Sequence, residues 1–199
     1  MNLINEAVDK LHALVEGSGL EEGAVTLSRN PDAPRCQYER GVCIEAHFGG
    51  GYGQVMTTYP LQAVTRLSFM YGAPLGNPEE KTAALAMINA AAGFLALTRK
   101  LHACREEDYL PCLTGLRNTV GAARIACIGD APVITREFAS QLVTDPEQAD
   151  ILLVLADGSI SGSTSPDTYR GKKRIIFIGP SFPGLCALLN LEHWCPFGR

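Results

Sequence analysis

Three short segments of the sequence carry residue types that can bind a small ligand. Each follows an apolar run: Gly-Asp-Ala-Pro at 129–132, Ala-Asp-Gly-Ser at 156–159, and Gly-Pro-Ser-Phe-Pro-Gly at 179–184. In an open parallel sheet, ligands bind beyond the carboxyl ends of the strands, where loops meet the amino termini of helices. We therefore expect the three segments to lie along one edge of a sheet and to form a ligand cleft.

The last of these segments has the features that an anion site needs. Gly179 allows a turn without a Cβ, Ser181 supplies a hydroxyl, and Gly184 lies at the start of a predicted helix. The free N–H groups and the dipole of such a helix start favour an anion. An ordinary strand-to-helix turn has the same composition, so both interpretations stay open.

Residues after the other two strands extend the candidate site. We expect Gly129 and Asp130 to contact the same anion and Asp157 to face the same cleft, although short acids also form turns. The segment at 159–167, Ser-Ile-Ser-Gly-Ser-Thr-Ser-Pro-Asp, adds hydroxyl and N–H groups that can bond a ligand or their own loop. Neither Gly-x-Gly-x-x-Gly nor Gly-x-x-x-x-Gly-Lys-Ser/Thr occurs, which argues against the familiar modes of dinucleotide and ATP binding.

A second candidate site lies in the first half of the chain. Cys43, Glu45 and His47 alternate along a predicted strand, so their side chains share one face. Thiolate, carboxylate and imidazole are metal-ligand types, and a divalent or heavy metal is the cofactor that they would hold, with further ligands from elsewhere. The alternative is the polar outer face of a sheet.

The cysteines allow a third hypothesis, an enzyme that uses a reactive thiol. The chain has seven cysteines at wide spacings and no Cys-x-x-Cys, and its amino terminus does not resemble a signal peptide. We therefore expect reduced thiols and a cytoplasmic protein. No Gly-x-Ser-x-Gly elbow occurs, and the sequence does not nominate a nucleophile and base pair.

The first half of the chain predicts an antiparallel α+β unit. Apolar residues recur at helical spacing over 3–15, and alternating patterns predict strands at 24–28, 41–48 and 54–58. The glycines at 49–53 form either a hairpin turn or a loop that closes over the cleft. A short helix is expected over 61–72.

The strongest helix prediction covers residues 77–101. Asn77 is the expected N-cap, Pro78 occupies the first turn, and Glu79 and Glu80 complement the positive end of the dipole. Apolar residues occupy nearly every face of this segment, which indicates burial on several sides.

A different pattern follows. Periodicity is weak over 104–123, and beyond it continuous apolar runs alternate with short helical segments, which is typical of a parallel sheet covered on both faces. We predict an antiparallel α+β domain at 1–103, a linker at 104–123 and a small Rossmann-like α/β domain with a mostly parallel sheet at 124–199.

Composition excludes some partners. The formal net charge is −4, and the only basic run is Lys-Lys-Arg at 172–174, so we expect no nucleic acid partner. The longest apolar-rich run, at 83–97, is mostly alanine and is interrupted by Asn89 and Gly93, so we expect no membrane span.

Three short motifs follow one another along most of the chain. They are Ala86, Asn89 and Ala90, then Cys127, Ile128 and Gly129, then Gly179, Pro180, Ser181, Pro183 and Gly184. Their order and spacing resemble a family proposed to chelate heavy metals, the domain of unknown function 364, which follows an enolase-amino-terminal-like domain. The resemblance implies two domains with a ligand cleft between them, and metal chelation as a proposed activity. Gly184 stands where leucine is usual, and the second domain looks shortened between residues 129 and 150 and again after residue 191.

These observations favour a protein that holds a small anionic molecule or a metal ion between its two domains. Whether it catalyses a reaction is left open. The alternative from a different class is an interaction subunit without chemistry that associates with itself as a homo-oligomer.

Overall fold

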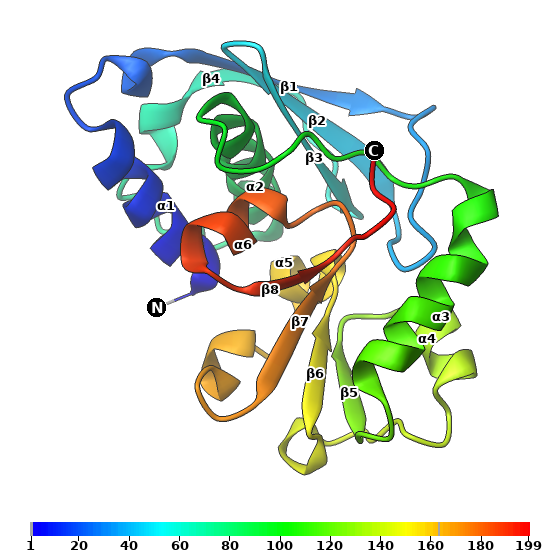
Figure 1. The fold of residues 1–199 in the computed structure, drawn as a ribbon. Coiled ribbons are helices and arrows are strands. Elements are labelled where there is room, and N and C mark those ends of the chain that lie inside the picture. The colour runs from blue at the N-terminus through cyan, green and yellow to red at the C-terminus, as the bar shows by residue number, and fades with distance from the viewer. Residues whose placement is uncertain (1, 163) are drawn as a thin grey trace.

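The computed structural model describes residues 2–162 and 164–199 (Figure 1). The helices and strands are α1 Leu3–Val15, β1 Ala24–Asn30, β2 Val42–Phe48, β3 Gly51–Thr57, β4 Ala63–Arg66, α2 Pro78–Phe94, α3 Tyr109–Val120, β5 Ile125–Ile128, α4 Pro132–Glu137, β6 Ile151–Val154, α5 Ala156–Ser161, β7 Arg174–Ile178, α6 Pro183–Leu189 and β8 Glu192–Trp194. Two four-stranded sheets result, which confirms an α+β half followed by an α/β half.

The first sheet is antiparallel, in the order β3-β2-β1-β4. The helix α2 packs along β2 and β3, and the tight β2–β3 hairpin turns at Gly49 and Gly50. A Cβ at Gly53 would lie 2.5 Å from the Ala90 nitrogen, so glycine here lets the strand approach the helix closely. The glycine-rich segment is thus a hairpin packed on α2, and it is not a loop that closes over the second sheet.

Two helix predictions for this half need correction. The Asn77 side chain caps α2 as predicted, because its oxygen accepts from the Glu80 N–H at 2.8 Å. The helix nevertheless ends at Phe94, since Ala96 adopts a left-handed conformation with φ of 55°. The segment at 61–72 forms β4 and a 3₁₀ turn at 67–70, because its β-branched residues pair with the free edge of β1.

The second sheet is parallel, in the order β5-β6-β7-β8. An isolated parallel bridge joins Leu142 to Ile125 on the edge of β5 that faces away from β6. The chain therefore runs outward from β5 to Leu142 and returns to β6, so the strand order reverses between β5 and β6. Doubly wound sheets bind ligands at such a reversal. Between residues 129 and 150, where the sequence looks shortened, α4 and this single bridge connect β5 to β6.

Both faces of the second sheet are buried, as its continuous apolar strands predicted. Along β6, Ile151 and Leu153 pack with α3 and α4, whereas Leu152 and Val154 face α5 and α6. The second group belongs to a core that also contains α1, α2 and the first sheet, so one apolar core runs through both halves. The expected linker at 104–123 contains α3, which packs on the outer face of this sheet.

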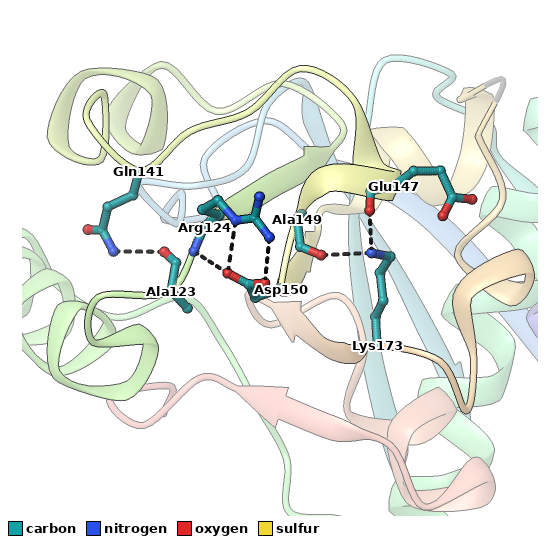
Figure 2. A network of polar contacts seen from close by, with 7 residues as sticks. All are labelled: Ala123, Arg124, Gln141, Glu147, Ala149, Asp150 and Lys173. Carbon is teal, nitrogen blue, oxygen red and sulfur yellow. Dashed lines mark hydrogen bonds and ion pairs between the residues drawn. The ribbon is translucent and has the colours of Figure 1, made fainter.

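Polar contacts align the amino ends of β5, β6 and β7 (Figure 2). The Asp150 carboxylate accepts from the Arg124 backbone N–H at 2.9 Å and from its guanidinium at 3.0 Å. The Lys173 ammonium donates to the carbonyl oxygens of Glu147 and Ala149 at 2.8 and 2.7 Å. The carboxyl ends of these strands consequently face the first half of the molecule. Of the helices in the described ranges, none is long and apolar enough to span a membrane.

Candidate functional site

The turn after β7 holds a carboxylate that belongs to the chain itself. Gly179 has φ of 99°, and a Cβ there would lie 2.6 Å from Glu39 Oε1, so a side chain would be both strained and obstructed. The Ser181 N–H donates to the same Glu39 oxygen at 3.3 Å. Glu39 comes from the segment before β2, so the predicted anion cradle receives its carboxylate from the first half.

The other residues of this turn bind the first half as well. Ser181 is fully buried, and its hydroxyl oxygen accepts from the Met56 N–H at 3.0 Å. Asn89 on α2 donates to the carbonyl oxygens of Gln54 and Ser181 at 3.1 and 2.8 Å, and it accepts from the Gly184 N–H at 2.9 Å. We call the contact around Glu39, Asn89 and Ser181 the seam. Ser181 and Gly184 already have partners there, which argues against their predicted contact with an external anion.

Burial alters the chemistry of Glu39. Its residue surface is only 8% exposed, and its Oε2 has no partner within the described residues. Desolvation by burial raises the pKa of this carboxyl to about 8, an effect that the hydrogen bonds from Ser181 reduce and that Asp157 increases. The seam therefore holds an uncharged carboxyl at neutral pH.

Gly129, Asp130 and Asp157 meet where the strand order reverses. Asp157 Oδ2 accepts from the Asp130 N–H at 3.1 Å, and the Asp130 carboxylate pairs with Arg40 Nη1 at 2.5 Å. A Cβ at Gly129, where φ is 109°, would lie 2.5 Å from Asp157 Oδ1. The three residues come together as predicted, but the backbone N–H at this strand end already binds a carboxylate of the chain.

Cys43, Glu45 and His47 share one face of β2, as predicted, but they do not converge. Glu45 Oε1 accepts from Asn30 Nδ2 at 2.8 Å and from the Tyr52 hydroxyl at 3.0 Å, and His47 Nε2 lies 3.9 Å from Glu45 Oε2. Cys43 is buried whereas His47 is exposed. Across residues 2–162 and 164–199, no three His, Cys, Asp or Glu side chains are arranged to hold a metal ion.

The environments of the cysteine thiols make them weaker nucleophiles at neutral pH. Burial raises the pKa of all seven cysteines, to about 12 for Cys43, Cys127 and Cys195. A catalytic thiol needs a lowered pKa, because the thiolate is the nucleophile. These environments therefore disfavour the reactive-cysteine hypothesis.

A pocket of about 200 Å³ opens where the two halves meet, on the side of α5 that faces α1 and α2. Its apolar wall comes from α1, β7 and the start of α6, and its polar wall from α2, α5 and the loop after α5. The lining residues are Asn2, Leu3, Ile4, Lys81, Gly158, Ser159, Gly162, Thr164, Ser165, Pro166, Phe177, Phe182 and Leu185.

Lys81 supplies the positive charge in this lining, and hydroxyl groups supply hydrogen bonds. The Ser159 hydroxyl oxygen is buried and has no partner within the described residues. Asn2 caps α1, with its side-chain oxygen accepting from the Ile4 N–H at 3.0 Å. Asp167 holds the loop against α1, since its Oδ2 accepts from the Leu3 N–H and the Ser165 hydroxyl, each at 3.0 Å. Lys81, Ser159 and the start of α1 therefore line one small pocket.

A solved structure has a similar fold. The chain is similar to a protein of unknown function from the DUF364 family of Desulfitobacterium hafniense DCB-2, with 15% identity, a TM-score of 0.50, and coverage of 93% of this chain and 82% of that chain. The two chains share a fold. No family model and no curated protein matches the sequence. The resemblance to DUF364 is thus confirmed as a likeness of fold, which assigns no ligand.

The sequence predicted some of the residues that line the pocket and missed others. The hydroxyl-rich segment 159–167 was expected to offer groups to a ligand, and three of its hydroxyl residues line the pocket, whereas Ser163 lies outside the described residues. Lys81 was missed, although a lysine directly after Glu79 and Glu80 is unusual in the first turn of a helix, where the dipole disfavours a cation. Glu39 carried no signal in the sequence.

Proposed function

We propose that this protein binds a small organic anion in the pocket between its halves. The observation that carries the proposal is that Lys81 and Ser159 line one pocket, and that the Ser159 hydroxyl is buried without a partner in the described residues. A buried polar group without a partner costs free energy, and a ligand that bonds to it recovers that cost. The ammonium group of Lys81 favours a ligand with negative charge.

The rest of the lining restricts the ligand further. Phe177, Phe182 and Leu185 form an apolar floor, which favours a ligand with an apolar body beside its charged group. At about 200 Å³ the pocket is smaller than those that hold drug-sized molecules, which begin at about 300 Å³. A compact molecule with one carboxylate or phosphate group meets these conditions.

The lining favours binding over catalysis. It contains no His, Cys, Asp or Glu among the described residues, and therefore lacks the usual general bases and the thiol nucleophile. Chelation, which the likeness to DUF364 suggested, has no set of converging ligands to support it in the described ranges. A binding protein for an organic anion is accordingly the function that the geometry supports best.

Calorimetric titration tests this proposal. A panel of small carboxylates and phosphate esters is titrated into the native protein, and native mass spectrometry first identifies any anion that co-purifies. Lys81→Met should weaken binding by about tenfold to a hundredfold, because a hydrogen bond to a charged group contributes about 1.5–3 kcal/mol. Lys172→Met, at an exposed position outside the pocket, is the matched control and should bind as the wild type. Equal affinity of the Lys81 variant would refute the proposal.

The alternative function, a self-associating subunit, is supported by a different surface. Val64 on the edge strand β4 is 76% exposed, and Phe69, which is 70% exposed, lines an apolar groove. Exposed edges and apolar patches favour association. Native mass spectrometry reads the number of subunits in the same experiment, and a dimer lost on Val64→Lys would favour this alternative.

A further inference from the structure

The seam contains a carboxyl group that no cation neutralises among the described residues. Glu39 Oε1 accepts from the Ser181 N–H, Oε2 has no partner within the described residues, and the carboxyl packs against the Cα of Gly179. The neighbouring Arg40 pairs with Asp130 instead. Removal of the proton from Glu39 would therefore leave a buried charge whose hydrogen bonds come from Ser181 alone among the described residues.

The surroundings of Glu39 increase this effect. The titratable groups that interact with Glu39 all become negatively charged when they ionise. They are Asp157 on α5, Cys36 in the same segment as Glu39, Cys43 on β2, and Cys195 after β8. His193 on β8 donates to the Gly179 carbonyl oxygen at 2.7 Å, and burial lowers its pKa. None of these groups can compensate a carboxylate at position 39.

We infer that the proton on Glu39 is a pH-sensitive latch for the seam, which holds the two halves closed while it is bound and loosens them when it leaves. The geometry makes the coupling direct, because the Ser181 residue that contacts Glu39 also accepts the Met56 N–H from β3. Ionisation at Glu39 therefore acts on the hydrogen bonds that join the first sheet to the turn after β7. This inference does not depend on the proposed ligand.

The direction of the pH effect follows from the two states. With the seam closed, burial raises the pKa of Glu39 to about 8, whereas a solvated carboxyl has its ordinary pKa of 4.5. Between these values the open state releases a proton that the closed state retains. Opening should therefore become more frequent by up to about tenfold per pH unit from about pH 5 to about pH 8, and then level off.

Hydrogen exchange of individual amides tests the latch. Protection factors, which are corrected for the intrinsic pH dependence of exchange, are measured for the Met56 and Ser181 amides between pH 5 and pH 9. In the wild type they should fall by about a hundredfold from pH 5.5 to pH 7.5. In Glu39→Gln, which keeps the acceptor oxygen, they should be independent of pH. Glu45→Gln removes a partly buried carboxyl on the adjacent β2 and should keep the wild-type profile.

Three outcomes would overturn the inference. One is a flat profile in the wild type, which can be measured even if a variant fails to fold. Another is the same profile in the wild type and in Glu39→Gln. The third is equal protection of the seam amides and the central amides of β6, because the proton would then act on global unfolding and not on the seam.

Discussion

Asn89 is the residue whose replacement tests the contact between the halves most directly. It lies in the middle of α2 with 1% of its surface exposed, among alanine, isoleucine and methionine. Its amide serves three backbone groups, namely the carbonyl oxygens of Gln54 and Ser181 and the N–H of Gly184. The change Asn89→Ala removes all three hydrogen bonds without adding volume.

The expected loss of stability follows from the groups left behind. Each buried backbone group that loses its partner costs about 1 kcal/mol or more, so three such groups cost at least about 3 kcal/mol. Alanine favours the helix over asparagine by about 0.5 kcal/mol, which offsets a small part of this cost. Small domains have a free energy of unfolding of about 5–15 kcal/mol, so the variant should fold and remain measurable.

Urea unfolding followed by the fluorescence of the single tryptophan, Trp194, measures this loss. Asn77→Ala is the matched control, because it makes the same change in the same helix. It removes one exposed cap bond, to Glu80, at an expected cost of about 1 kcal/mol. If Asn89→Ala costs no more than Asn77→Ala, the three bonds do not stabilise the contact and the reasoning is refuted.

Two further predictions concern the thiols and the exposed ion pair between the halves. A thiol reagent at pH 7 should label the native protein slowly, because burial raises the pKa of each thiol, and it should label all seven cysteines after unfolding. Rapid labelling of one cysteine in the native protein would restore the reactive-thiol hypothesis. Arg40→Ala should lower the free energy of unfolding by less than about 1 kcal/mol, since its pair with Asp130 is exposed; a larger loss in urea unfolding would show that this pair helps to hold the halves together.

The sequence predicted those elements whose signals are local. Asn77 and Pro78 indicated the start of α2, alternation indicated β2, and unbroken apolar runs indicated β6 and β7 with both faces covered. The resemblance to DUF364, drawn from short motifs, agreed with the fold found by structural comparison. These signals depend on neighbouring residues, which explains why they could be interpreted without the rest of the chain.

Elements that depend on distant partners were misjudged. The segment at 61–72 has no strong local preference, and it becomes β4 because β1 offers a free edge. The helix α3 was missed since its periodicity is weak, and it is stabilised by packing against the outer face of the second sheet. In both cases tertiary contacts decide the conformation, and propensity does not.

The same distinction between local signals and distant partners explains what the sequence could predict about the candidate site. Ser181 and its neighbours at the start of α6 indicated backbone N–H groups in need of an acceptor. The sequence could not tell which acceptor would arrive, and at Ser181 it is Glu39, 142 residues away. Asp157 meets the corresponding need of Asp130. A motif of this kind therefore predicts a hydrogen-bond acceptor such as a carboxyl group, and it does not distinguish a ligand from a side chain.

A polar group that the chain leaves without a partner is a more selective guide to a ligand. At the seam, glycine turns and helix starts are already bonded by Asn89 and Glu39, so a ligand there would have to displace them. On the other side of α5, the Ser159 hydroxyl has no partner in the described residues, and Lys81 lines the same pocket. If binding persists in Lys81→Met but is lost in Ser159→Ala, hydrogen bonding and not charge selects the ligand, and the search should turn to neutral molecules.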